Sequence, residues 1–456
     1  MQPLLAASLA QLLADRARET PDAVAVHLAG STLSYSRLNE MVAGRAASLG
    51  AMNVAPGAVL ALAANGSDLL LTMLAAHWSG HPFMPLDPAT AELRWPQLCP
   101  STPPLPCLLP AAPLPGTAAV ALEPASGESA ALIIATSGSE GAPKGVVLPH
   151  RALLAAAMAS NARIPLSTAD TWLDCLPLTH VGGLSIFWRS FLAGASVRLH
   201  EGFDTSAVWA DLQAGRASHI SLVPAMLAQL LELADGAPPP ATLRCVLVGG
   251  AALSRPLWQQ ARDAGWPLHV SYGMSETAAQ IALLLPTDDW HEGLVGHALP
   301  AVDLAIGDDG RIRMRGPQRM RGYLGGAMQD CDEWLTTGDL GRIDPDGTLT
   351  VLGRADDVLV SGGHNLHPAE IEARLANCPG VEDAAVTRSS DPVWGDIITA
   401  LVVGGAGEDS VAAWCRASLP SPMRPRRIVC VAALPRNAMG KLERRRLPDL
   451  LAESCR

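Results

Sequence analysis

Short apolar runs alternate with amphipathic stretches at the start of the chain. The runs AVAVHL and VLALAA are typical of buried strands. The stretches around Leu38–Leu49 and Leu69–His77 repeat their apolar positions at helical spacing. Strands and helices that alternate in this way predict a layered α/β domain.

The same alternation continues beyond a Pro-, Ala- and Ser-rich stretch at 96–128, which predicts an irregular connection. The apolar run ALIIAT predicts a short buried strand that leads straight into a Gly/Ser-rich turn, and RALLAAAMASNARI then predicts a helix. Strand and helix signals follow to about residue 300, RCVLVGGA and PLHVSYG among them.

The pattern changes near residue 302. The segments VDLAIGDDGRIRMRG and GRIDPDGTLTVLGR carry turn signals between short alternating runs, which predicts the hairpins of a small antiparallel β unit. After Arg354 the chain predicts a small α+β region, with a helix at PAEIEARLANC and strands at DAAVTR and DIITALVV.

Composition limits the function classes. A length of 456 residues suggests two or three domains. Because 49% of the residues are hydrophobic and 17% are charged, the chain can bury a large core. The net charge of −11 argues against binding to nucleic acid, and no apolar run has the length of a membrane span. The first residues lack the basic start of a secretory signal, and the nine cysteines form no CxxC pair, so we expect a reducing cytoplasm.

Lysine is nearly absent from this chain. Of 33 basic residues only Lys144 and Lys441 are lysines, and arginine supplies the rest. A lysine that persists in such a composition is a candidate for a site that needs a compact, mobile ammonium group.

Lys144 closes a turn that suits phosphate. In TSGSEGAPKG (136–145), glycines allow backbone N–H groups to approach phosphate oxygens, hydroxyls add donors and the lysine adds charge. The spacing is not that of a Walker A loop.

The same turn resembles the phosphate-binding signature of the adenylate-forming superfamily, which contains the acyl-CoA synthetases, and further motifs of that superfamily follow in its order. These are SYGMSET (271–277), WLTTGDLGRIDPDG (334–347), GRADDVLVSGGHNLHPAEIE (353–372) and LPRNAMGKLERRRL (434–447). The resemblance implies an AMP-binding domain at 1–353, a hinge at 354–358 around Asp356, and a mobile C-terminal lid domain at 359–456.

The resemblance also implies the chemistry: ATP and Mg²⁺ activate a carboxylic acid as an acyl-adenylate, and coenzyme A accepts the acyl group. Lys441 would bridge the carboxylate and the α-phosphate, Lys144 would neutralise the β- and γ-phosphates, and Glu276 would hold magnesium. Tyr272 would stack on adenine and Asp339 would accept from the ribose hydroxyls. The full set of implied nucleotide-binding residues is Thr136, Ser137, Gly138, Ser139, Gly141, Lys144, Gly250, Ala251, Tyr272, Gly273, Ser275, Asp339 and Arg354.

The segment HVGGLSIFWRS (180–190) further resembles the o-succinylbenzoate–CoA ligases of menaquinone biosynthesis. His180 would then be a catalytic residue that lines the acyl pocket near the incoming thiol. The pocket residues implied are His180, Arg189, Gly249, Gly250 and Met274. An arginine on a helix is usually solvated, which is the alternative for Arg189.

Three other functions stay open at this point. The chain could ligate another aromatic or medium-chain acid, load a carrier protein that acts in trans, or bind ATP without catalysis. Two residues depart from the superfamily pattern: Glu140 stands in the phosphate turn, and His364 stands in the loop that faces the thiol site.

Overall fold

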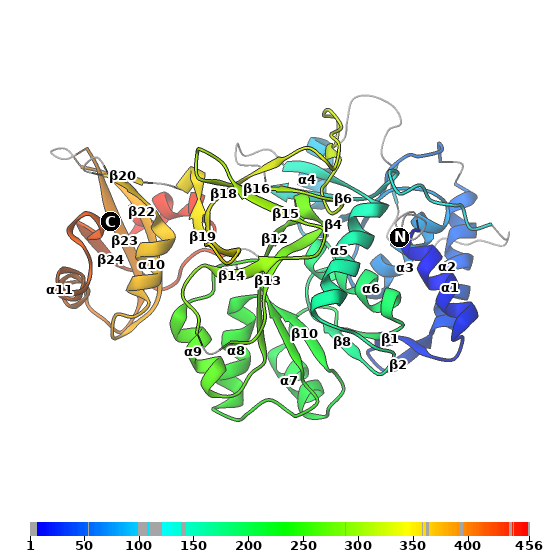
Figure 1. Cartoon of the computed structure of the whole chain (residues 1–456), viewed down its shortest axis with the longest axis horizontal. Helices are drawn as coiled ribbons and strands as arrows, with labels where there is room; N and C mark the ends of the chain where they lie inside the picture. The colour runs from blue at the N-terminus through cyan, green and yellow to red at the C-terminus, as the bar shows by residue number, and fades with distance from the viewer. Residues whose placement is uncertain are drawn as a thin grey trace.

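The structure is a computed structural model of the whole chain, viewed in Figure 1. It describes residues 7–52, 54–98, 107–109, 121–137, 143–287, 289–357, 359–361, 364–391, 395–436, 440 and 442–454.

A long mixed sheet forms the centre of the large N-terminal part. Among the described residues its order is β15-β16-β18-β19-β14-β13-β12-β11-β10-β8-β9-β1-β2, and the run from β12 to β1 is parallel. The parallel strands are β1 (Val24–Leu28), β8 (Thr171–Asp174), β9 (Ser196–Leu199), β10 (His219–Leu222), β11 (Cys245–Val248) and β12 (Leu268–Met274). Because parallel strands end at a common edge, the loops after β8, β10, β11 and β12 gather there.

The antiparallel strands extend both ends of that sheet. They are β2 (Ser31–Ser34), β13 (Ala279–Leu284), β14 (Leu294–Ala298), β15 (Asp303–Ile306), β16 (Arg311–Arg315), β18 (Leu335–Ile343) and β19 (Thr348–Arg354). The hairpins predicted after residue 302 are therefore present. They do not form a separate unit, because β14 pairs with both β13 and β19 and joins them to the large sheet.

A second sheet has the order β17-β7-β6-β4-β3-β5. Its strands are β3 (Leu60–Ala63), β4 (Phe83–Leu86), β5 (Cys107–Leu108), β6 (Ala130–Ser137), β7 (Pro143–Pro149) and β17 (Gly322–Tyr323). The helix predicted at RALLAAAMASNARI is present as α5 (His150–Arg163). Between the phosphate turn and this helix the chain returns as β7, antiparallel to β6, a strand that the sequence did not predict, so the turn joins the two strands of a hairpin.

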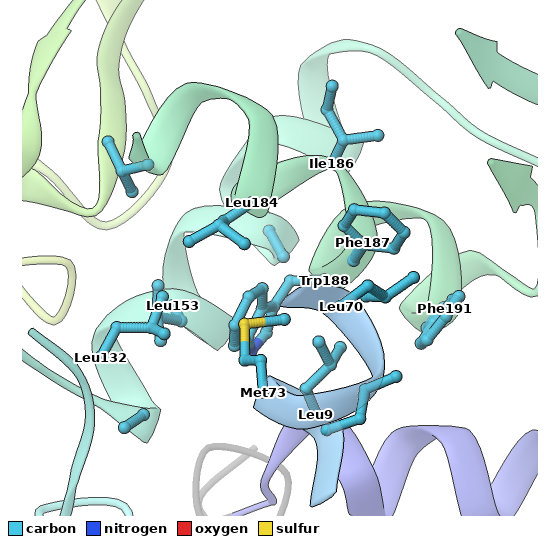
Figure 2. Packing of buried hydrophobic residues seen from close by; sticks show 14 of the residues in the cluster. Leu9, Leu70, Met73, Leu132, Leu153, Leu184, Ile186, Phe187, Trp188 and Phe191 are labelled. Atoms are coloured by element: carbon cyan, nitrogen blue, oxygen red, sulfur yellow. The ribbon is translucent and has the colours of Figure 1, made fainter. Parts of the chain in front are cut away.

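Helices fill the space around the two sheets, and several are apolar on all sides. In α3 (Gly66–Trp78) nearly every side chain is buried, which identifies a helix packed between layers. Figure 2 shows Leu70 and Met73 of α3 against Trp188 and Phe191 of α6. The helices of the large part are α1 (Leu9–Glu19), α2 (Tyr35–Gly50), α3, α4 (Ala91–Leu98), α5 (His150–Arg163), α6 (Val181–Ala193), α7 (Thr205–Gln213), α8 (Pro224–Ala234) and α9 (Arg255–Asp263).

The C-terminal part is a small α+β unit with hydrophobic cores of its own, at the left of Figure 1. It contains β20 (Leu359–Ser361), β21 (His364–Leu366), α10 (Pro368–Leu375), β22 (Val381–Asp391), β23 (Gly395–Gly404), α11 (Glu408–Ser418), β24 (Arg427–Cys430) and α12 (Leu447–Glu453). The short helix η3 (Ala355–Asp357) connects it to β19. The predicted helix and both predicted strands of this region are present.

No helix within the described ranges has both the length and the apolar character needed to cross a bilayer.

Candidate active site

The phosphate turn lies at the end of the β6–β7 hairpin. Thr136 and Lys144 face each other across the two strands, and the Thr136 hydroxyl donates to the Lys144 carbonyl oxygen at 3.3 Å. Gly138, Ser139, Glu140 and Gly141, with the side chain of Ser137, lie outside the described residues. The hairpin thus places Lys144 beside the turn.

The SYGMSET motif ends β12 and turns sharply through η2 (Ser275–Thr277). A Cβ on Gly273 would lie 1.9 Å from the Ala279 carbonyl oxygen, so only glycine fits there. Ala278 and Ala279 both adopt positive φ values, 54° and 115°. Strained backbone of this kind collects at functional sites, and here it follows directly on Ser275 and Glu276.

Tyr323 of β17 reaches this turn, although the predicted site did not include it. Its hydroxyl donates to Glu276 Oε1 at 3.0 Å, and its ring centroid lies 5.4 Å from Lys144 Nζ. Burial, followed by the Glu276 charge, raises the pKa of Tyr323, so the phenol stays protonated as a donor. The available sequence signal was its place in MRGYLG in a chain with only three tyrosines.

A second cluster joins three of the predicted nucleotide residues. Tyr272 Oη donates to Asp339 Oδ2 at 2.7 Å, and Arg354 Nη1 donates to Asp339 Oδ1 at 3.2 Å. The β18–β19 pairing creates this arrangement, because Asp339 and Arg354 are directly opposite. Burial and the Asp339 charge raise the pKa of Tyr272. An ionised carboxylate has four acceptor positions, so Asp339 can still accept from further hydroxyls.

Gly249, Gly250 and Ala251 follow β11 at the common strand edge. A Cβ on Gly249 would lie 2.6 Å from Ser271 Oγ, and Gly250 has a φ of +80°. A Cβ at Gly249 would force the Ser271 hydroxyl to move, whereas the positive φ of Gly250 favours glycine through its backbone conformation. Met274, at the end of the neighbouring β12, lies at the same edge.

His180 is the N-cap residue of α6, which begins shortly after β8. Burial, followed by the nearby Arg94 guanidinium, lowers the pKa of His180, so its imidazole is neutral at pH 7. A neutral imidazole can accept a proton or a hydrogen bond.

Arg189 is buried on the same helix, so the alternative of a solvated arginine is wrong. Its guanidinium carbon lies 4.2 Å from the Trp172 ring centroid, and Nη2 donates to Ser185 Oγ at 3.2 Å. Nη1 has no hydrogen-bond partner within the described part of the chain. Burial lowers the pKa of Arg189 to about 10, which leaves it cationic at neutral pH.

Lys441 lies outside the described residues, but its neighbour Gly440 is described. Gly440 has a φ of +68°, and a Cβ there would lie 2.9 Å from Ala225 Cβ at the start of α8. Val223, which follows β10, lies within contact distance of Cβ atoms built on both Gly250 and Gly440, at 3.5 and 3.7 Å. Gly440, the residue before Lys441, therefore lies against the same strand edge as the predicted nucleotide residues.

The predicted hinge residue Asp356 lies in η3, with Oδ2 3.6 Å from Arg354 Nη2. The next residue, Asp357, pairs with Arg444 Nε at 2.9 Å, and Arg444 also binds Glu372 of α10 through two hydrogen bonds of 2.7 and 2.8 Å. Arg444 thus connects the hinge region with the lysine loop. The side chain of His364 lies outside the described residues.

Comparisons with known proteins identify the family of this chain. The family described as AMP-binding enzyme matches residues 100–324, and the family described as AMP-binding enzyme C-terminal domain matches residues 370–441. A 2–succinylbenzoate–CoA ligase of Bacillus cytotoxicus is 33% identical over 97% of this chain and 98% of its own length. One of Listeria monocytogenes is 36% identical over 70% of each chain.

Solved structures are similar to this chain over nearly its whole length. The o-succinylbenzoate coenzyme A synthetase MenE of Bacillus subtilis, in complex with ATP and magnesium, superposes with a TM-score of 0.85 at 29% identity, covering 96% of this chain and 99% of that one. ATP-bound MatB of Rhodopseudomonas palustris superposes with a TM-score of 0.86 at 26% identity, covering 96% and 98%. The resemblance seen in the sequence motifs is confirmed, and so is the predicted fold class.

Proposed function

The chain belongs to the family of AMP-binding, adenylate-forming enzymes, and on that premise we propose that it is an AMP-forming ligase joining 2-succinylbenzoate to coenzyme A. The similarity to a 2-succinylbenzoate–CoA ligase over 97% of this chain and 98% of the relative carries this proposal. The reaction serves menaquinone biosynthesis. Free cysteines within the described part of the chain support a reducing, cytoplasmic setting.

In the first half-reaction the carboxylate attacks the α-phosphorus of ATP and pyrophosphate leaves. Negative charge accumulates on the phosphate oxygens, so the protein's task is to supply fixed donors and cations. Lys144 supplies a cation beside the hairpin turn. The turn itself supplies hydrogen-bond donors to the phosphate oxygens, from Thr136, Ser137, Gly138, Ser139 and Gly141. Lys441 bridges the carboxylate and an α-phosphate oxygen, and the docking of Gly440 on Ala225 supports its delivery to this edge.

The nucleotide's ribose and adenine bind at the ends of β11 and β12, beside Asp339 of β18. Asp339 accepts from the ribose hydroxyls, held by Tyr272 and Arg354 on its two oxygens. Gly250, Ala251 and Gly273 allow the nucleotide to approach the backbone, and Ser275 donates to the α-phosphate. Gly273 supports this role, because a side chain at this position would collide with the Ala279 carbonyl oxygen and only backbone can line the site there.

The Glu276 carboxylate fits a magnesium site. Mg²⁺ prefers oxygen ligands from one or two carboxylates together with substrate phosphates. Tyr323 donates to Oε1, and no described residue donates to Oε2, which can therefore face a cation. When bound, the metal supplies charge that neutralises the phosphate oxygens during displacement.

The acid pocket includes His180, Arg189, Gly249, Gly250 and Met274. 2-Succinylbenzoate carries two carboxylates, and only one of them reacts. A buried cation with an unpartnered Nη1 within the described residues suits the second carboxylate, which supports Arg189 as its partner. In the second half-reaction the C-terminal domain turns about Asp356, and coenzyme A thiol attacks the acyl-adenylate near His180.

The test is a thioester assay with ATP, magnesium, coenzyme A and a panel of acids headed by 2-succinylbenzoate. The proposal expects a strong preference for that acid. A preference for another aromatic or medium-chain acid would show that the proposed substrate is wrong and that the proposed reaction is right. Pyrophosphate release without a coenzyme A thioester would move the acceptor to a carrier protein in trans. No exchange of pyrophosphate with any acid would refute ligase activity.

A further inference from the structure

Tyr323 contacts both charged groups of the phosphate side of the site. Its hydroxyl donates to Glu276 Oε1 at 3.0 Å, and Lys144 Nζ lies 5.4 Å from its ring centroid. Glu276 lies in η2, between β12 and β13 of the large sheet, and Lys144 lies in β7 of the second sheet, so the Tyr323 side chain connects the two halves of the site.

The backbone around Tyr323 is fixed on both sides. Leu324 N donates to the Gly145 carbonyl oxygen at 2.7 Å, and Tyr323 pairs with Val146 of β7. Met320 N donates to the Glu276 carbonyl oxygen at 2.9 Å. The segment therefore holds the phosphate hairpin with one end and the Glu276 turn with the other.

A tyrosine supplies what other side chains do not. The hydroxyl gives a charge-assisted hydrogen bond to a carboxylate, and the ring face attracts an ammonium ion. Phenylalanine keeps the ring and lacks the donor, whereas a serine keeps a donor and lacks the ring.

We propose that Tyr323 is a positioning residue for adenylation, which orients the Glu276 carboxylate toward magnesium and holds the Lys144 ammonium beside the phosphate turn. The proposal rests on the function proposed above and goes beyond it in naming a residue that couples metal binding to phosphate binding. In this role Tyr323 acts through Glu276 and Lys144, the two side chains that it contacts.

The test compares Tyr323→Phe and Tyr323→Leu with the wild-type enzyme in pyrophosphate exchange. Magnesium is varied at fixed ATP, and MgATP is then varied at saturating magnesium. We expect Tyr323→Phe to raise the magnesium activation constant about tenfold and to change the KM for MgATP less than about threefold. Tyr323→Leu should raise both, because it also removes the ring under Lys144.

Tyr35→Phe is the matched control. It removes a tyrosine hydroxyl that donates to the Ala195 carbonyl oxygen at 2.7 Å. Ala195 precedes β9, and β8, β10 and β11 separate β9 from β12, the strand that leads to Glu276. The magnesium constant of Tyr35→Phe should equal that of the wild type. In a Glu276→Gln background, Tyr323→Phe should have no further effect on magnesium dependence.

An unchanged magnesium constant in Tyr323→Phe would overturn the positioning role, and so would an equal rise in Tyr35→Phe. Thermal unfolding of each variant shows whether a loss of activity is caused by unfolding. If it is, Tyr323→Phe and Tyr35→Phe are compared at a temperature below the unfolding transitions of both variants. A wild-type enzyme without pyrophosphate exchange would instead refute the proposed function, so the two failures are distinguishable.

Discussion

Replacing Gly440 by alanine tests whether the lysine loop docks on the large domain for adenylation. Gly440 precedes Lys441 and has a φ of +68°, and its added Cβ would lie 2.9 Å from Ala225 Cβ. Two separate penalties follow. The left-handed backbone conformation costs an alanine about 1–2 kcal/mol wherever the loop keeps it. The contact with Ala225 costs extra only while the loop is docked.

The contact penalty can be bounded from packing. Forcing one extra methyl group into a filled contact costs about 1–3 kcal/mol. At about 1.36 kcal/mol for each factor of ten, this corresponds to about a five- to 150-fold loss of adenylation rate. The backbone penalty adds about five- to 30-fold if the docked loop cannot relax.

A double-mutant cycle separates the two penalties. Ala225→Gly removes the methyl group that Gly440→Ala would meet, so the double variant should recover the contact penalty and keep the backbone penalty. Pyrophosphate exchange with 2-succinylbenzoate measures adenylation, and thioester formation from supplied acyl-adenylate measures the second step. Adenylation within twofold of wild type in Gly440→Ala, or no recovery in the double variant, would refute docking of this loop during adenylation.

Three further predictions follow from the same geometry. Arg444→Gln should lower the free energy of unfolding by about 1–3 kcal/mol in urea titration, because it removes the cation that pairs with both Glu372 and Asp357. The control is Arg446→Gln, which loses an exposed ion pair and should change the free energy of unfolding by less than about 0.5 kcal/mol. Burial lowers the pKa of His77 to about 4 and that of His150 to about 3, so the free energy of unfolding should fall as the pH drops below 6.5, the ordinary pKa of histidine. Between pH 7 and pH 5 each histidine should lower it by about 2 kcal/mol, and His150→Phe should abolish the part due to His150. An equal free energy of unfolding at both pH values would contradict this. Lys441→Ala should impair adenylation far more than thioester formation from supplied acyl-adenylate, whereas Asp356→Pro should do the reverse; equal losses in both steps would count against these roles.

Local sequence pattern predicted those features that depend on neighbouring residues. The apolar runs around Ala61 and Val246 become strands because the period and length of each run already match a buried strand. Ordered motifs predicted the chemistry of Lys144, Glu276 and Asp339. The structure adds that Asp339 is held by Tyr272, a contact between residues far apart in the chain.

Other features depend on pairing between distant segments, which no local pattern encodes. The segment PKGVVLP contains two prolines and a glycine, so it has weak strand signals, yet it forms β7 because β6 and β17 pair with it on either side. The role of Arg444 could not be predicted because its partners, Asp357 and Glu372, come from a different part of the sequence. For the same reason the approach of Gly440 to Ala225 is visible only in three dimensions.

The position of β17 at the edge of the second sheet has a consequence for synthesis on the ribosome. The edge of β7 leaves the ribosome long before Gly322 and Tyr323 do, because most of the large sheet is encoded between them. Throughout that interval the phosphate hairpin of the nascent chain has an unpaired edge on β7, and such edges favour pairing with other chains. Slowing translation within this interval should therefore lower the yield of folded enzyme, and supplying a chaperone should restore it.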